Sequence, residues 1–365
     1  MSEIKRNYGI DMLKICSMIM ILILHILSKT NLLTNVSPFS LNYCFVWILE
    51  ITCFCSVNCY AMISGYNMWN KNNNISKAIN LWFQVMFYSL TILFIALIFF
   101  NDKIQTIDII NSIFPITRNQ YWYITSYIGM YIFIPAMNII IDKLNKRRLE
   151  TMFIFIFIII ILFPNLLRGD PYNLNSGYSV AWLSIMYLLG AYFSKYKILQ
   201  KIKIKTYILT FIIMILLTFT SKICIYFLTK QFLGAPKSEN IFISYLSPTI
   251  IINSICMLSI FSRLKIRKLN LELIKKLSVS TLGVYLIHVN PILLKIINYT
   301  FPYYNTKCHL MLLFIFISTI TIYSICSMFD IIRIYIFKKV HINTLCIKIE
   351  EILTEKFKHF ITNKN

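Results

Sequence analysis

Residues 6–29 read RNYGIDMLKICSMIMILILHILSK, and this stretch decides the fold. Beyond its first residues it is an apolar block of about 20 residues, which as a helix can cross a hydrocarbon core roughly 30 Å thick. Lipid offers no hydrogen-bond partners to exposed backbone groups, so a spanning segment is either a helix or a strand of a closed barrel. Barrel strands alternate apolar and polar residues, and blocks such as residues 153–163 do not. The stretch therefore predicts a membrane-spanning helix.

Blocks of this kind recur along the whole chain. Of its 365 residues, 58% are hydrophobic and only 14% are charged, whereas about a quarter of the residues of a soluble domain are charged. The sequence therefore predicts an all-α fold, a polytopic membrane helix bundle of about ten transmembrane helices. The expected spans are residues 8–28, 42–66, 78–100, 121–141, 150–166, 178–194, 206–228, 241–261, 278–294 and 310–332.

The distribution of positive charge predicts the orientation of the bundle. The net charge of +22 would by itself also suit a protein that binds nucleic acid. The charge lies in short segments between the apolar blocks, however, which is the pattern of membrane topology. With the N-terminus inside, the inner segments hold 26 Lys and Arg residues and the outer loops hold 8. We therefore expect both termini in the cytoplasm and no nucleic-acid partner.

One domain and a short tail account for the chain. Residues 1–335 are expected to form the transmembrane domain, because the loops are short and no internal repeat is visible. Residues 336–365 mix apolar residues with Lys and Glu, and suit either a basic amphipathic helix on the inner leaflet or a solvated tail. Most of the ten cysteines lie in apolar blocks, where cysteine behaves as a small hydrophobe. Their spacing predicts no metal site.

The first span carries three ionisable side chains. Such groups cost on the order of 2.5–3.5 kcal/mol at a helix centre by insertion scales and tend to face the bundle interior. Asp11 and Lys14 are three residues apart and can pair on a helix. Lys14 and His25 are eleven residues apart, about 20° from alignment at 100° per residue, so they share a face. This predicts a polar stripe along the helix, although an interface ion pair and a histidine bonded to a neighbouring helix would explain the same spacing.

Two other spans place ionisable groups at the depth of His25. The second span carries Glu50 in its outer half and Ser64 near its inner end, close to the same helix face. The ninth span runs from inside to outside and contains His288 in its later part, which puts this side chain in the outer half as well. A histidine with a carboxylate partner is a general-base arrangement. His25, Glu50 and His288 are therefore the candidate catalytic residues, with a chance match in depth as the alternative.

Other sequence signals are weaker. The fourth span opens with the aromatic run Tyr121-Trp122-Tyr123, which an interfacial aromatic belt explains without any function. No phosphate-binding glycine loop, dinucleotide fingerprint or serine nucleophile elbow is present in the sequence. The sequence therefore predicts no nucleotide-hydrolysing or serine-hydrolase chemistry.

The polar residues of the first span resemble a known family. The opening Arg6-Asn-Tyr-Gly-Ile-Asp-Met-Leu-Lys14, with His25 late in the same span, is similar to the signature of the membrane-bound acyltransferase 3 family. Further segments agree with the family in the same order and together span most of residues 6–291. These segments are residues 58–66, Trp122-Tyr123, residues 186–192 and residues 283–288.

The resemblance implies a bacterial cytoplasmic-membrane enzyme. Such proteins move an acyl group, usually acetyl, from cytoplasmic acetyl-coenzyme A onto hydroxyls of a cell-surface polysaccharide or its lipid-linked precursor. The family's key histidine corresponds to His25, and the acid and basic residue near the start of that helix correspond to Asp11 and Lys14. The family commonly has Arg at the last position, and Lys keeps the charge but loses the bidentate fork.

Roles for the candidate residues follow from the shared helix face, the matched depth and this resemblance together. His25 is expected either to remove a proton from the acceptor hydroxyl or to carry the acyl group covalently. Glu50 is expected to orient His25, and His288 to bind the acceptor or assist the proton transfer. The expected coenzyme A site lies at the inner face, where phosphates meet cationic and polar side chains, and comprises Arg6, Asp11, Lys14 and Ser64.

Three other functions fit parts of the pattern. A transporter or flippase of a lipid-linked glycan also needs many helices and intramembrane charges, and it would move its substrate without loss of an acyl group. A polysaccharide polymerase usually has a large outer loop, whereas the longest outer loop expected here is residues 101–120. A non-catalytic scaffold would tolerate the loss of both His25 and Glu50.

Overall fold

The computed structural model describes residues 6–71, 74–266, 271–297 and 307–362. Regular structure in these ranges is helical, and a π-helical stretch at Ile156–Leu162 joins α8 to α9. The helices are α1 Tyr8–Lys29, α2 Leu32–Asn35, α3 Leu41–Cys53, α4 Ser56–Met68, α5 Ile75–Phe99, α6 Thr106–Ile113, α7 Trp122–Lys143, α8 Lys146–Phe155, α9 Phe163–Leu167, α10 Val180–Tyr196, α11 Ile204–Leu233, α12 Pro248–Ser262, α13 Leu271–His288, α14 Pro291–Ile296, α15 Cys308–Lys339 and α16 Ile342–Thr362.

The all-α membrane bundle is confirmed. Among the described residues, seven helical segments are long and apolar enough to cross a membrane, namely Tyr8–Lys29, Leu41–Met68, Ile75–Phe99, Trp122–Lys143, Lys146–Leu167, Ile204–Leu233 and Cys308–Lys339. The other three expected spans overlap α10, α12 and α13, which have 17, 15 and 18 residues. Helix α12 begins seven residues after the predicted start at 241, and α13 begins seven residues before the predicted start at 278 and ends at His288. Ten crossings, and the side of the membrane on which each terminus lies, stay predictions.

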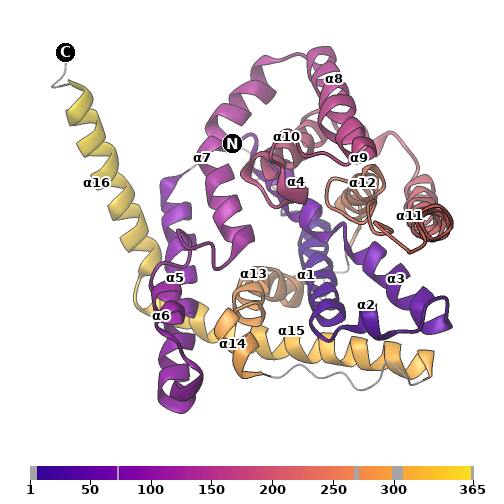
Figure 1. Cartoon of the computed structure of the whole chain (residues 1–365). Coiled ribbons are helices and arrows are strands. Elements are labelled where there is room, and N and C mark those ends of the chain that lie inside the picture. The colour runs from indigo at the N-terminus through magenta and orange to yellow at the C-terminus, as the bar shows by residue number, and fades with distance from the viewer. Residues whose placement is uncertain (1–5, 72–73, 267–270, 298–306, 363–365) are drawn as a thin grey trace.

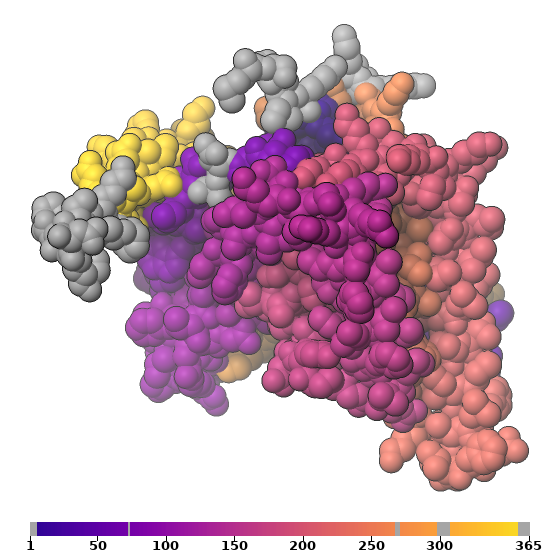
Figure 2. Space-filling model, turned by 90° about the horizontal axis from the view of Figure 1, so that it is seen from above, coloured from indigo at the N-terminus to yellow at the C-terminus, as the bar shows by residue number. Residues whose placement is uncertain are grey.

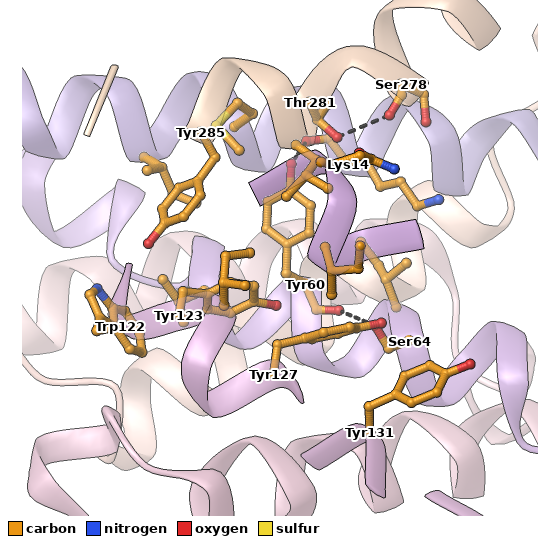
Figure 3. A pocket seen from close by; sticks show the side chains of 18 of the residues that line it. Lys14, Tyr60, Ser64, Trp122, Tyr123, Tyr127, Tyr131, Ser278, Thr281 and Tyr285 are labelled. Carbon is orange, nitrogen blue, oxygen red and sulfur yellow. Dashed lines mark hydrogen bonds between the residues drawn. The ribbon is translucent and has the colours of Figure 1, made fainter. Parts of the chain in front are cut away.

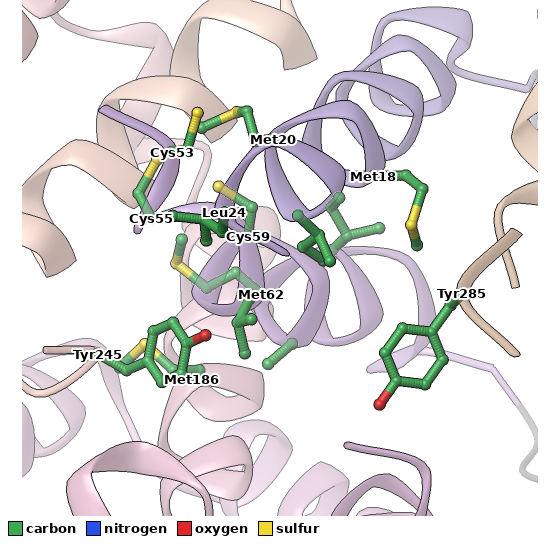
Figure 4. Close-up of a cluster of buried hydrophobic side chains, with 14 of the residues drawn as sticks. Met18, Met20, Leu24, Cys53, Cys55, Cys59, Met62, Met186, Tyr245 and Tyr285 are labelled. Atoms are coloured by element: carbon green, nitrogen blue, oxygen red, sulfur yellow. The ribbon is translucent and has the colours of Figure 1, made fainter. Parts of the chain in front are cut away.

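Helix α1 is the centre of the bundle (Figure 1). It packs against α13 and α15 on one side and against α3, α4 and α12 on the other. Buried sulfur-containing side chains fill the space around α1 and α4, among them Met18, Cys59 and Met62 (Figure 4). Unbranched Met and small Cys side chains fit irregular gaps between helices. All ten cysteines are free.

Two ends of the bundle can be defined by the termini of α1. At the Arg6 end, the N-cap residue Asn7 donates from Nδ2 to the carbonyl of Ser262 at the end of α12. At the Lys29 end, short connecting segments are joined by polar contacts, such as the ion pair between Lys295 and Asp108. Partial burial opposes ionisation of the Asp108 carboxyl, but hydrogen bonds from Lys295 and from the Gln105 N–H outweigh it and lower its pKa.

The second expected span is interrupted. Helix α3 ends at Cys53 and α4 begins at Ser56, where the sequence predicted one continuous helix. The carbonyl of Cys55 accepts from the Cys59 N–H and also from the Ser254 hydroxyl of α12, so a neighbouring helix contacts the backbone at the break. Glu50 therefore lies in the last turn of α3, just before the break.

Apolar side chains cover the outside of the bundle. Phe94 of α5, Phe155 of α8, Leu209 of α11 and Ile320 of α15 are all more than half exposed. In Figure 2, α11 forms one side of the molecule and α16 lies at the other. Large exposed apolar surface is a liability in water, but it is the surface that hydrocarbon requires.

The C-terminal helix α16 packs on α5. The carboxylate of Glu350 accepts from the backbone N–H groups of Ile75 and Ser76 at the start of α5, which satisfies donors that a helix N-terminus leaves unpaired. The predicted boundary at residue 335 falls within α15, which ends at Lys339. The division into a domain and a tail stays a prediction.

Helices α4 and α10 approach each other through two glycines. A Cβ on Gly190 would overlap the carbonyl of Met62, and a Cβ on Gly65 would overlap the carbonyl of Tyr187. Small residues at such crossings let helix backbones pack closely within a membrane. This contact fixes α10 against α4.

We predict that Gly190→Ala lowers the stability of the protein by about 1–3 kcal/mol, the usual cost of overpacking. The added methyl group meets backbone atoms of Met62 that cannot rotate away. Gly169→Ala is the control, because its Cβ would have Pro171 Cδ as nearest neighbour at 3.7 Å. Thermal unfolding of both variants in detergent measures the difference, and equal midpoints would contradict the prediction.

Candidate active site

A cavity of about 620 Å³ runs beside α1. Its lining includes Arg6 and Lys14 at one end of α1 and His25 and Ser28 at the other. The remaining walls come from α3, α4, α5, α7 and α13 and from connecting segments. Figure 3 shows Lys14 at one end of this space and Trp122 at the other. One continuous space therefore connects the Arg6 end with His25, and we call it the main cavity.

A single carboxylate organises the Arg6 end of the main cavity. Asp11 is buried, and its Oδ2 accepts from Arg6 Nε at 2.5 Å. Its Oδ1 accepts from Ser278 Oγ at 2.9 Å and lies 3.8 Å from Lys14 Nζ. Asp11 does not line the cavity, but it holds two cations that do. With Lys77 also in the lining, this end of the cavity carries positive charge.

Tyrosines line the middle of the main cavity (Figure 3). The Tyr60 hydroxyl donates to the carbonyl of Lys14 at 2.7 Å. The Tyr127 hydroxyl and Ser64 Oγ are 3.3 Å apart, and the Tyr123 ring lies 6.0 Å from those of Tyr127 and Tyr285. The lining thus combines flat apolar faces with hydroxyl groups, which suits a long ligand that is partly apolar and partly polar.

His25 forms a direct hydrogen bond with His288. His25 Nδ1 and His288 Nε2 are 2.9 Å apart, and the two rings are tilted by 40° with centroids 5.0 Å apart. The other nitrogen of His288, Nδ1, lies 2.6 Å from the carbonyl oxygen of Val284. Helices α1 and α13, which are 263 residues apart at these positions, are brought together by this pair.

The partners of His288 assign the protons on both rings. A carbonyl oxygen only accepts, so His288 Nδ1 carries a proton and donates it to Val284. His288 is buried, and burying an unpaired charge is costly, so this ring is neutral and its Nε2 accepts. His25 Nδ1 is then the donor of the shared bond. His25 Nε2 is left as an acceptor, which is the form that a general base needs.

Glu50 lies in the same cavity as His25 but is not its hydrogen-bond partner among the described residues. The side chain is 7% exposed, and its Oε2 atom is buried without a hydrogen-bond partner within that part of the chain. Buried carboxyl oxygens in folded proteins are nearly always bonded. The geometry therefore gives the orientation of His25 to His288 and leaves Glu50 facing a space that a ligand can fill.

A second, smaller cavity of about 190 Å³ lies on the other side of His25. Lys29, Gln120 and His288 contribute its polar lining. His25, Trp122 and Tyr285 line both this cavity and the main cavity. His25 therefore stands in the wall between a space that reaches the Arg6 end and a space near the Lys29 end.

The structure brings most of the predicted site residues to one cavity. Arg6, Lys14, His25, Glu50 and Ser64 line the main cavity. Asp11 lies behind the first two, and His288 lies behind His25. The predicted roles of these residues stay predictions, because position alone does not test chemistry.

Sequence reasoning missed the tyrosines of the cavity wall. It explained Trp122 and Tyr123 as part of an interfacial belt, whereas both line the main cavity. Tyr123, Tyr127 and Tyr131 are spaced four residues apart on α7 and share one face of that helix. This spacing was the available signal, although an apolar helix packed against neighbours would show the same pattern.

Comparison with known proteins gives one finding. A family model described as an acyltransferase domain matches residues 7–329. No curated protein and no solved structure matches the chain. The matched range covers α1 to most of α15 and so contains every residue of the main cavity except Arg6.

We predict that His25 is the Nδ1–H tautomer in the native protein and that His288→Leu removes this preference. The leucine offers no acceptor to His25 Nδ1, so the proton is free to move to Nε2. His288→Gln is the matched control, since its amide can both accept and donate. Nitrogen-15 NMR of histidine-labelled protein in nanodiscs reports the tautomer. An Nε2–H form of His25 in the unaltered protein would contradict the assignment.

Proposed function

The chain belongs to this acyltransferase domain family, and we propose that it is an integral membrane O-acyltransferase, more narrowly an O-acetyltransferase. The donor is cytoplasmic acetyl-coenzyme A, and the acceptor is a hydroxyl of a cell-surface polysaccharide or of its lipid-linked precursor. The observation that carries the proposal is the main cavity, which joins a cationic end to a histidine with a free acceptor nitrogen. The reaction links two compartments, so it needs a passage of this kind.

The Arg6 end suits the phosphates of coenzyme A. Arg6, Lys14 and Lys77 line this end of the cavity, and cationic donors bind phosphate through strong, charge-assisted hydrogen bonds. The thioester arm then extends past the tyrosines toward His25. Lys14 and His25 are eleven residues apart, about 16 Å along the helix axis at 1.5 Å per residue, a distance that an extended pantetheine arm bridges.

His25 acts as the general base in the proposed transfer. Its Nε2 takes the proton of the acceptor hydroxyl as that oxygen attacks the thioester carbonyl carbon. The carbon–sulfur bond breaks, the acyl group stays on the acceptor oxygen, and the thiolate of coenzyme A takes up the proton from the imidazolium. His288 holds the His25 ring in position through its Nε2. The alternative route, with the acyl group carried on His25, uses the same nitrogen as nucleophile.

The proposed location is the bacterial cytoplasmic membrane. The Arg6 end then faces the cytoplasm, as the excess of Lys and Arg in the expected inner segments favours. The Lys29 end, with His25 and His288 nearby, faces outward, where the surface glycan is assembled. This orientation supplies donor and acceptor from opposite sides.

Transport of a lipid-linked glycan is the second candidate function. A cavity lined by residues from both ends of α1 also suits a path for a substrate. A transporter moves its substrate without consuming an acyl donor, so the release of free coenzyme A thiol separates the two functions.

We predict that His25→Ala lowers the rate of acetyl transfer by about 10²- to 10⁴-fold, the usual contribution of a general base. The rate is measured with radiolabelled acetyl-coenzyme A and de-O-acylated polysaccharide from a strain that lacks the gene, using purified protein in nanodiscs. His309→Ala is the control, because His309 is an exposed histidine at the start of α15. Transfer at the unaltered rate by His25→Ala would remove His25 from the chemistry.

We predict that Lys14→Ala raises the KM for acetyl-coenzyme A by about 10- to 100-fold, the equivalent of one charged hydrogen bond. The effect should shrink as salt concentration increases, because salt screens the attraction to phosphate. Lys275→Ala is the matched control, since Lys275 is an exposed lysine of α13 outside the cavity lining. An unchanged KM for Lys14→Ala would place the donor phosphates elsewhere.

A further inference from the structure

A third cavity, of about 640 Å³, lies at the Lys29 end. Two connecting segments form most of its wall, residues 164–178 and residues 238–246. It is lined by many polar side chains, among them Asn165, Arg168, Asp170, Ser238, Glu239 and Asn240. Neither the sequence prediction nor the proposed donor path uses these residues.

Buried contacts hold the walls of this polar cavity in place. Lys222 of α11 is fully buried, and its Nζ donates to Glu239 Oε1 and Asn240 Oδ1, both at 2.7 Å. Asn165 Nδ2 donates to the carbonyl of Leu246 at 3.0 Å and so joins the two segments. A charge buried in a membrane span has a large cost unless it is paired. The positions of these polar groups are therefore set before any ligand arrives.

The polar cavity adjoins the His25 end of the main cavity. Phe54 and Tyr178 line both spaces. Their rings belong to an aromatic group in which the Tyr178 centroid lies 4.3 Å from that of Trp122 and 5.2 Å from that of Tyr245. Trp122 in turn lines both cavities that His25 lines. A ligand in the polar cavity would therefore contact aromatic rings that also line the main cavity, in which His25 lies.

The chemistry of the polar cavity indicates a neutral, polyhydroxylated ligand. Arg168 lines the cavity together with Asp170 and Glu239, and Glu239 is paired with Lys222. The lining therefore has no excess of positive charge that would favour a diphosphate. Among the described residues no group of three or more His, Cys, Asp and Glu side chains could hold a metal ion. A sugar ring packs its C–H face on an aromatic ring and needs donors and acceptors around its hydroxyls. The lining supplies both.

We propose that the polar cavity is the acceptor subsite. It binds an uncharged sugar residue of the glycan with its ring against Tyr178 and Phe54, so that a hydroxyl of this or the next residue reaches His25. This inference rests on the proposed function, since it names where the acceptor of that reaction binds. The smaller cavity behind His25 is the competing location, but it has less than a third of the volume and fewer polar side chains.

The test fills the polar cavity without removing a contact. Gly169 lines the cavity, and a Cβ there would have only Pro171 Cδ within 4 Å, at 3.7 Å, so Gly169→Trp should place an indole where the sugar binds. We expect the KM for de-O-acylated polysaccharide to rise at least about tenfold, a loss of 1.4 kcal/mol, with unchanged binding of radiolabelled acetyl-coenzyme A. Lys230→Trp, at an exposed position of α11, is the matched control. Lipid-linked oligosaccharide from the same strain serves as a second acceptor, and the acceptor that shows the larger effect is the natural source.

Two alanine substitutions test the acceptor subsite without adding a bulky side chain that could disturb folding. Arg168→Ala and Ser176→Ala remove single polar groups of the lining, and each should raise the acceptor KM by about 2- to 10-fold, the equivalent of one hydrogen bond. If Gly169→Trp loses binding of acetyl-coenzyme A, the two alanine variants alone test the acceptor subsite. Unchanged acceptor KM in all three variants would overturn the subsite. So would a larger rise in acceptor KM for Gln120→Trp, which fills the smaller cavity, than for Gly169→Trp. The proposed function itself would be overturned if the unaltered protein showed no release of coenzyme A thiol that depends on His25.

Discussion

A polar stripe on a helix surrounded by lipid has to be covered by protein, and the architecture follows from this constraint. Helix α1 carries Asp11, Lys14 and His25 along one side, and each would be costly in hydrocarbon. Neighbouring helices supply the partners: Ser278 bonds Asp11 and His288 bonds His25. The central position of α1 in Figure 1 is the consequence.

The same rule applies away from the cavity. Asp330 of α15 is fully buried and accepts from Arg333 on its own helix and from the Tyr88 hydroxyl of α5. Gly283 of α13 makes room for this group, since a Cβ there would overlap the Asp330 carboxylate. Lys222 is satisfied in a similar way at the Lys29 end. Such networks fix the relative positions of helices whose lipid-facing sides have no preference for one another.

The polar groups divide into those that are paired and those that face open space. The Asp330 network is closed and has a structural role. In contrast, Glu50 retains a buried oxygen without a partner in the described part of the chain, and Arg6 and Lys14 line a cavity although one carboxylate serves both. The chain belongs to an acyltransferase family. An acyltransferase needs polar groups that face open space, because these groups can bind a donor and an acceptor.

The sequence by itself determined the helical membrane class, the approximate positions of the long spans and the helix face shared by Lys14 and His25. These depend on block length and on a period of 3.6 residues, which are local properties. Only the tertiary structure decided that His288, and not Glu50, bonds His25, and that tyrosines of α7 line the space between the cationic end and the histidine. It also decided the break between α3 and α4 and the pairing of Lys222 with Glu239. Such contacts depend on the rotation and tilt of helices that are distant in the chain, and hydrophobic periodicity does not specify which polar groups on two apolar helices will meet.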